Sequence, residues 1–157
     1  MTKRPSNDCT SIWDLLRQEY VALRPRFPSL REPAHNYLQL NVGGKAAHYE
    51  WKVLHAPRSL LEVALHFEAA SPEENLEALA LVEGRAATIR GSTLTPFVSG
   101  RWGGKWTRVG FQVDLVGDSD DGAVRQSAEL MQLLVERTYP LVKNVLDRSA
   151  ETGWPAA

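Results

Sequence analysis

Residues 37–54 read YLQLNVGGKAAHYEWKVL, and this stretch decides the fold class. Leu38 and Leu40 alternate with more polar neighbours, which is the two-residue period of a β-strand. The glycine pair at 43–44 follows, and glycine supplies the positive φ angles of a two-residue hairpin turn. We therefore predict an antiparallel hairpin whose return strand covers residues 46–54.

The return strand carries polar side chains at alternate positions. A two-residue loop places Gln39 opposite His48, and a third strand over residues 61–67 keeps its large apolar side chains on the other face. The polar face predicted in this way has two imidazoles, two carboxylates and an ammonium: His48, Glu50, Lys52, Glu62 and His66.

Two chemistries are open to this polar face. Imidazoles and carboxylates are ligands for divalent ions, so His48, Glu62 and His66 are candidate metal ligands. Glu50 and Lys52 have the E-x-K spacing of restriction-type nucleases, in which the carboxylate binds a metal and the lysine stabilises charge on the phosphate. The structural alternative is a solvated face on which Lys52 and Glu62 form a cross-strand pair.

Helices flank the predicted strands. Apolar residues recur at helical spacing from Ser11, and Arg24-Pro25 ends that helix. Ser71-Pro72-Glu73-Glu74 has the cap, the proline and the acidic residue of a helix start, and this helix should stop by Gly91. A last helix follows the acidic turn at 118–121 and should kink at Pro140.

The order of elements is therefore helix, three strands, helix, two strands, helix. We predict an α+β fold with an antiparallel five-stranded sheet and helices mainly on one face. Residues 10–150 form the single domain, between a flexible N-terminus at 1–9 and a frayed tail at 151–157.

A second hairpin, over residues 93–102 and 105–115, carries the basic residues of interest. If Gly103-Gly104 is its whole loop, Arg101 lies opposite Trp106, and one outer face presents Phe97, Arg101, Trp106 and Arg108. Between Arg85 and Arg108 there are five basic residues and no acidic one. Aromatic rings and guanidinium groups bind single-stranded nucleic acid, and Trp and Arg are also enriched in protein interfaces. The candidate binding residues are Phe97, Arg101, Trp106, Arg108, Lys105 and Arg90.

A purely structural role for this surface is the alternative. An arginine over a tryptophan is an ordinary cross-strand contact, and the face can also lie beneath the first helix.

Composition limits the classes of protein further. The 157 residues have a formal net charge of -1, which excludes a histone-like basic coat. The single cysteine, Cys9, cannot form an internal disulfide, so a reducing compartment is expected. The longest apolar run has five residues, Ala78–Val82, so we predict a cytoplasmic protein that does not enter membranes. Motifs for nucleotide, dinucleotide and esterase chemistry are absent from the sequence, and we expect no cofactor.

Scattered aromatic and charged positions resemble an uncharacterised bacterial domain family that often follows restriction-nuclease-like modules. They lie between Asn36 and Leu146 and include Tyr49-Glu-Trp51, Glu74-Asn75-Leu76, Ile89, Arg101–Arg108 and Tyr139-Pro140-Leu141. The resemblance implies work near DNA and does not itself imply catalysis. The order of elements is also similar to that of bacterial secretion chaperones, which are small dimers that hold another protein's chain.

These observations predict a non-catalytic binding module that recognises nucleic acid or a nucleic-acid-processing partner of the defence or restriction type. The first alternative is a dimeric protein-interaction module similar to a secretion chaperone. The second is a metal-dependent nuclease that uses Glu50 and Lys52.

Overall fold

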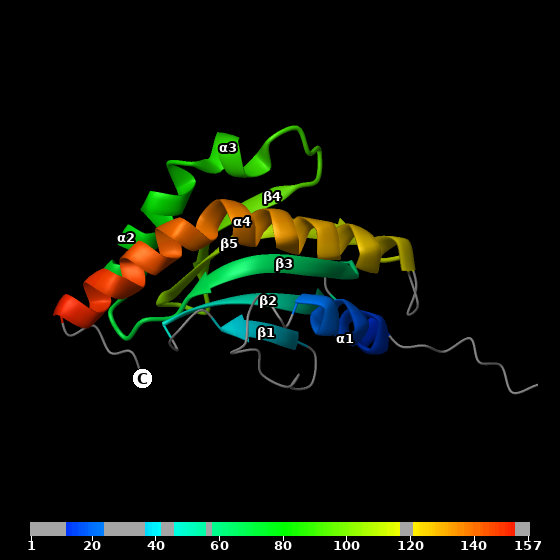
Figure 1. Cartoon of the computed structure of the whole chain (residues 1–157), viewed down its shortest axis with the longest axis horizontal. Coiled ribbons are helices and arrows are strands. Elements are labelled where there is room, and N and C mark those ends of the chain that lie inside the picture. Colours follow the sequence, from blue (N-terminus) through cyan, green and yellow to red (C-terminus); the bar gives the residue numbers. More distant parts are fainter. Residues whose placement is uncertain (1–11, 24–36, 42–45, 56–57, 117–120, 153–157) are drawn as a thin grey trace, which may run out of the picture.

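The computed structural model describes residues 12–23, 37–41, 46–55, 58–116 and 121–152 (Figure 1). Its fold is α+β with one antiparallel sheet, as predicted. In chain order the elements are α1 (Ile12–Leu23), β1 (Tyr37–Asn41), β2 (Ala47–Leu54), β3 (Leu60–Phe67), α2 (Pro72–Glu83), α3 (Ala86–Arg90), β4 (Phe97–Trp102), β5 (Trp106–Asp114) and α4 (Asp121–Thr152).

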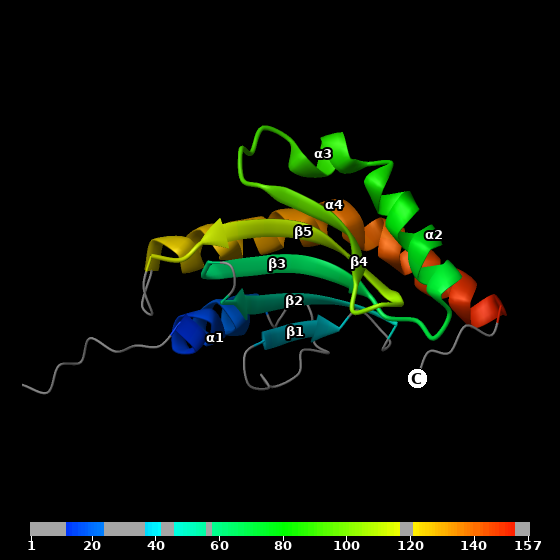
Figure 2. The same cartoon turned by 180° about the vertical axis from the view of Figure 1, so that it is seen from behind.

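The sheet has the strand order β1-β2-β3-β5-β4, so β4 forms one of its edges. Each neighbouring pair is antiparallel. Helices α1 and α4 lie together across one face of the sheet, and the opposite face is turned toward the viewer in Figure 2. Because side chains alternate along a strand, this arrangement gives the sheet a helix face and an outer face.

The helix face contains the apolar core. Tyr49 and Trp51 of β2, Leu65 of β3 and Phe111 of β5 are fully buried there. The Tyr49 hydroxyl lies 2.7 Å from the Thr138 hydroxyl of α4. The Thr138 hydroxyl donates its single proton to the Leu134 carbonyl at 2.6 Å, so Tyr49 is the donor in its bond to Thr138.

The helix predicted to run from Ser71 to Gly91 is two helices. Ser71 caps the first, since its hydroxyl accepts from the Glu74 backbone N–H at 3.4 Å. Gly84 follows the last residue of α2, and the chain resumes as the short α3. The prediction of one helix was therefore wrong, because glycine is a poor helix former and Gly84 ends the first helix.

The last helix, α4, continues through Pro140. Glu151 and Thr152, predicted to belong to the frayed tail, are its final residues. The predicted flexible N-terminus, the acidic turn at 118–120 and Gly43-Gly44 lie outside the described residues. None of the described helices combines the length and the apolar character that a bilayer-spanning segment needs.

Gly110 allows the central strands to approach closely. It lies opposite Ala64 of β3 on the outer face. A Cβ atom at position 110 would collide with the Val63 carbonyl oxygen and would lie 2.5 Å from the Cα atom of Ala64. Only glycine fits here without moving one of the two strands.

Candidate metal centre

The outer face collects the polar side chains of β2 and β3. The register pairs His48 with His66 and Lys52 with Glu62, and it puts Glu50 opposite Ala64. The predicted polar face is confirmed, because all five of its residues project from the side of the sheet opposite the helices.

The first hairpin has a longer loop than predicted. Gln39 pairs with Glu50, and Asn41 pairs with His48, so residues 42–46 connect the strands. The shift in register is two residues, and an even shift leaves every side chain on its predicted face. Gln39 Nε2 lies 3.3 Å from Nε2 of His48 and donates to Oε2 of Glu50 at 3.3 Å.

The interpretation of this face as solvated is wrong. His48 is 3% exposed, Glu50 is 5% exposed, and Glu62 and His66 are fully buried. Part of the cover is Trp102, whose ring meets the His66 ring edge-on with centroids 5.9 Å apart. Lys52 Nζ and the Arg108 guanidinium lie 4.3 and 4.2 Å from the Trp102 ring. Two cations therefore flank the indole that shields His66 from water.

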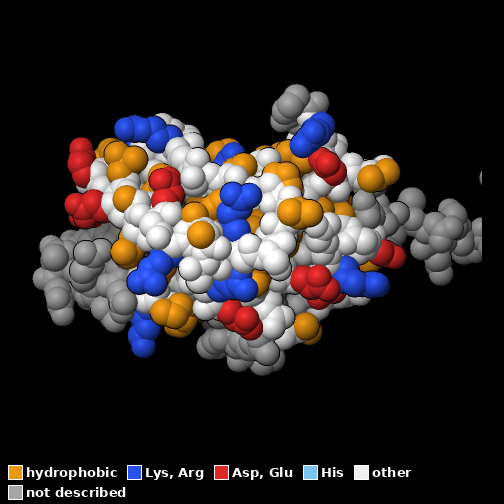
Figure 3. Space-filling model, turned by 90° about the horizontal axis from the view of Figure 1, so that it is seen from above, with side chains coloured by type: hydrophobic (Ala, Val, Ile, Leu, Met, Phe, Trp, Pro, Cys, Tyr) orange, Lys and Arg blue, Asp and Glu red, His pale blue; other side chains and the backbone are white. Residues whose placement is uncertain are grey.

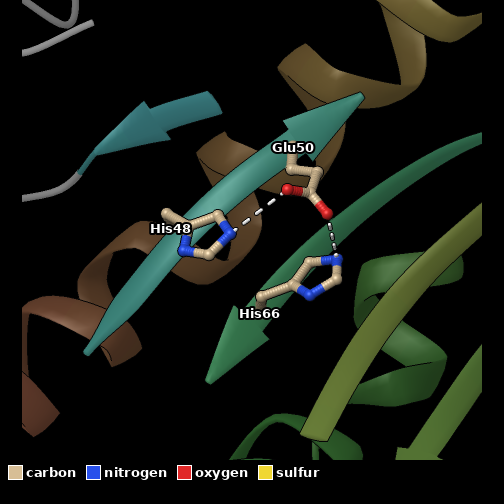
Figure 4. A group of neighbouring side chains, drawn as sticks. All are labelled: His48, Glu50 and His66. Carbon is tan, nitrogen blue, oxygen red and sulfur yellow. Dashed lines mark ion pairs between the residues drawn. The ribbon is translucent and has the colours of Figure 1, made fainter. Parts of the chain in front are cut away.

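Two imidazoles and one carboxylate meet on this face, and we call them the His–Glu–His site: His48, Glu50 and His66 (Figure 4). One ligand atom from each residue can be chosen so that all three lie within 4.8 Å of one another. Nε2 of His48 is 3.4 Å from Oε2 of Glu50, and Nε2 of His66 is 3.2 Å from Oε1. Figure 4 shows the Glu50 carboxylate between the two rings.

Burial sets the protonation of the site. Loss of solvent lowers the pKa of His66 to about 3, although the Glu50 charge opposes this, so the ring is neutral near pH 7. Burial alone would raise the pKa of Glu50, but the adjacent His48 ring and the His66 ring outweigh it and lower the pKa. A neutral imidazole beside an ionised carboxylate is the form in which both groups bind metals.

The ring nitrogens of His66 make no well-formed hydrogen bond among the described residues, although the side chain is fully buried and Nε2 lies 3.2 Å from Oε1 of Glu50. Buried polar groups normally have a well-formed hydrogen bond, and a bound ion would supply the interaction that His66 lacks. Tetrahedral zinc with bonds of about 2.0–2.1 Å separates neighbouring ligand atoms by about 3.3 Å. The two nitrogen-to-oxygen separations in the His–Glu–His site are close to this value but involve the two different oxygens of Glu50. With one ligand atom from each residue the three atoms lie within 4.8 Å, so the side chains would have to move closer together around an ion.

Glu68 supplies a second carboxylate at the edge of the site. Its Oε1 lies 4.0 Å from Nε2 of His48 and 3.8 Å from Nδ1 of His66. Burial raises the pKa of Glu68, and a bound cation would favour its ionised form. The sequence contains a signal for this residue that we did not use: His48-Tyr49-Glu50 and His66-Phe67-Glu68 are the same His-aromatic-Glu pattern on adjacent strands.

Glu62, predicted as a metal ligand with the two histidines, belongs to a different group. It accepts from Gln112 Nε2 at 2.9 Å, and its Oε1 lies 3.3 Å from Arg108 Nη1. Burial raises the pKa of Glu62 despite both contacts. Glu50, rather than Glu62, completes the site with the two histidines. In the register, Glu50 is two residues from the His48–His66 pair along the sheet, whereas Glu62 is four residues from it.

The E-x-K candidates Glu50 and Lys52 share the outer face. Glu50 belongs to the His–Glu–His site, while Lys52 contacts the Trp102 ring and is paired across the strands with Glu62. Their proposed catalytic role stays a prediction.

The second hairpin places the predicted binding residues on two different faces. Phe97 pairs with Phe111, Arg101 with Thr107, and Trp102 with Trp106. The loop therefore has three residues, 103–105, and the shift of one residue exchanges the faces. Our expectation of one shared surface for Phe97, Arg101, Trp106 and Arg108 was wrong.

Each of these residues has a separate environment. The Phe97 ring contacts the Phe111 ring on the helix side, with centroids 5.2 Å apart. Arg108 is on the outer face and contacts Glu62. Trp106 is half-buried, and Arg101, Lys105 and Arg90 are exposed.

Comparisons of the chain with known proteins found no match. No family model matches the chain, and neither do any curated protein or any solved structure. The resemblance to a nuclease-associated domain family and the likeness to secretion chaperones stay predictions.

Proposed function

We propose that the protein is a metal-binding α+β module that holds a divalent transition-metal ion at the His–Glu–His site. The observation that carries this proposal is the buried cluster itself: Nε2 of His48 and Nε2 of His66 lie 3.4 and 3.2 Å from the Glu50 carboxylate, and the ring nitrogens of His66 make no well-formed hydrogen bond among the described residues.

The ligand set favours particular metals. Two imidazole nitrogens and one carboxylate suit Zn²⁺, Co²⁺, Ni²⁺ or Fe²⁺, whereas Mg²⁺ prefers an all-oxygen shell that retains water. The absence of thiolate from the set argues against Cu⁺. We therefore expect selectivity for first-row transition metals over Mg²⁺.

The position of the site indicates what the metal does. His48 and Glu50 come from β2, and His66 comes from β3, so one ion would join the two strands. Trp102 covers His66. With three protein ligands, a four-coordinate ion keeps one position for water or another ligand, as in catalytic sites, whereas structural sites have four protein ligands.

The test is a titration of chelator-treated protein with ZnCl₂, CoCl₂ and MgCl₂, followed by isothermal calorimetry and thermal unfolding. Zinc and cobalt should bind one ion per chain, and excess metal at ~100 times Kd should stabilise the fold by about 2.7 kcal/mol. Cobalt should produce the visible absorption bands of a four-coordinate site. Mg²⁺ at the same concentration should change neither the heat nor the unfolding temperature.

Matched variants locate the site. His66→Gln and His48→Gln each remove one ligand and should weaken zinc binding at least about tenfold. His55→Gln is the control, because His55 is exposed and lies outside the site. Equal zinc affinity in His66→Gln, His55→Gln and the parent protein would overturn the proposal, as would a parent protein that fails to bind either zinc or cobalt.

Nucleic-acid binding is a second candidate function, on a smaller surface than the sequence suggested. Arg101 and Lys105 at the second hairpin are exposed, and the Arg85–Arg108 segment has no acidic residue that would repel phosphate. Fluorescence polarisation with single- and double-stranded oligonucleotides at ~50 and ~200 mM salt tests it, because phosphate contacts weaken steeply with salt.

The double variant Arg101→Gln/Lys105→Gln should reduce this affinity and its salt dependence. Arg17→Gln/Arg58→Gln removes two exposed arginines outside the basic segment and should leave both unchanged. A parent protein that binds neither oligonucleotide at the lower salt concentration would exclude this candidate.

A further inference from the structure

A cavity lies away from the metal centre, between the residues that follow α3 and the first half of α4. Its volume is about 340 Å³, within the range of about 300–1,000 Å³ usual for small-molecule sites. Arg90, Thr93 and Thr95 line one wall, and Leu130, Leu133 and Arg137 line the other. We call it the α3–α4 cavity.

One guanidinium of this cavity is held firmly. Nη1 of Arg137 donates to the backbone carbonyls of Thr88 and Ile89, both at 2.8 Å. Gly91 makes this approach possible, since it has a φ of +54° and a Cβ atom there would lie 2.6 Å from Nη1. Because the fold already fixes the group, a ligand that binds it loses little further side-chain entropy.

A second guanidinium lies on the same wall as the hydroxyls. Arg90 is placed over the Phe97 ring at 5.9 Å and is exposed toward solvent. The cavity lining contains these two arginines and one carboxylate, Glu129, so the lining carries a net positive charge. A cavity with this balance attracts anions.

The hydroxyl of Thr95 adds a neutral donor. Its oxygen accepts from the Thr93 hydroxyl at 3.2 Å and from the Gln126 amide at 3.1 Å. With its acceptor positions occupied, the Thr95 hydroxyl has its own proton available to donate. Thr95 is only 9% exposed, so this donor is partly desolvated and stronger toward an anion than it would be in water.

We propose that the α3–α4 cavity binds a small organic anion, with a carboxylate or phosphate group on Arg90 and Arg137 and an apolar part on Leu130 and Leu133. Figure 3 views the molecule from the side on which α3 lies. Lys and Arg side chains lie near the middle of this face among hydrophobic and neutral side chains, and acidic side chains lie toward both ends and at one edge. The site does not depend on the metal, since its residues come from α3, the segment after it and α4.

Isothermal calorimetry at constant ionic strength tests the proposal with four probes: phenyl phosphate, benzoate, inorganic phosphate and benzyl alcohol. Phenyl phosphate or benzoate should bind with one saturable site per chain, and the stronger of the two identifies the anionic group. Inorganic phosphate lacks the apolar part, and benzyl alcohol lacks the charge, so each should bind at least about tenfold more weakly than the stronger anion.

Three variants connect binding to the cavity. Arg90→Gln should weaken the stronger anion at least about tenfold, while Arg85→Gln, an exposed arginine outside the cavity, should leave it unchanged. Glu129→Gln removes the single carboxylate and should strengthen binding severalfold. No saturable binding of either aromatic anion at ~10 mM would overturn the proposal, and so would unaltered affinity in both Arg90→Gln and Glu129→Gln.

Discussion

The two faces of the sheet are both buried, yet they are built in opposite ways. On the helix face, Trp51 and Phe111 exclude water by close packing of apolar side chains. On the outer face, His66 and Glu62 are equally buried and lie among charged and polar neighbours. Removal of a side chain should therefore have different consequences on the two faces. A cavity results on the helix face, and an unpaired charge results on the outer face.

The largest effect is expected on the helix face. Phe111→Ala removes a fully buried ring that contacts Phe97, so it should lower the free energy of unfolding by about 3–5 kcal/mol. Urea denaturation of the metal-free protein measures this. A loss below about 1 kcal/mol would mean that the helix face is not closely packed.

The next effect distinguishes the faces most directly. Arg108→Met removes the guanidinium that contacts the buried Glu62 carboxylate and leaves only Lys52 on the facing strand, so we expect a loss of about 3 kcal/mol. The double variant Glu62→Leu/Arg108→Met removes both charges and should regain most of that loss. Urea denaturation of the parent, both single variants and the double variant gives the coupling energy.

The double variant could instead lose as much unfolding free energy as the two single variants lose together. In that case Glu62 and Arg108 would have no coupling energy. The outer face would then resemble the helix face in its response to substitution.

A smaller effect is expected from the polar contact described on the helix face between Tyr49 and Thr138. Tyr49→Phe removes the donor to Thr138 and should cost about 1 kcal/mol, because Thr138 keeps its own bond to the Leu134 carbonyl. Thermal unfolding should show a small decrease in Tm. The ring of Phe replaces that of Tyr, so a loss above about 3 kcal/mol would contradict the assignment of Tyr49 as a simple donor.

The smallest effect is a dependence of stability on pH from the outer face. Burial raises the pKa of Glu62 in the folded protein above its ordinary value of 4.5. The folded chain therefore holds this proton more tightly than the unfolded chain does, and the resulting stability is present at acid pH and lost as pH rises through the raised pKa. Glu62→Gln should reduce the decline in stability as pH rises above the ordinary glutamate value of 4.5. An unchanged decline would show that Glu62 does not cause it.

The two hairpins show how far the sequence could predict these faces. In both, the glycine pair suggested a two-residue loop, and in both the loop is longer. The first shift was even, so the polar face of His48 and His66 was predicted correctly. The second shift was odd, so Phe97 and Arg101 moved to the helix side. Alternation predicts which residues of one strand share a face. The length of the hairpin loop decides which residues of the next strand lie on that same face.

Other parts of the site depend on contacts distant in sequence. Trp102 covers His66 only because β4 and β3 are both neighbours of β5, which local spacing cannot reveal. The burial of the outer face was missed for the same reason. The division between α2 and α3 had a local signal in Gly84, although we predicted one helix up to Gly91.

The strand β4 has one further consequence, for the behaviour of the protein at high concentration. An edge strand has free backbone groups that can recruit the edge of another molecule. Pro96 stands directly before β4, the exposed Arg101 lies near its end, and Gly100 has a φ of +148° that interrupts the regular extended path. A proline, a charge and an irregular backbone are features that discourage intermolecular sheet growth. Replacing them would favour self-association into larger aggregates before it altered the fold of the monomer.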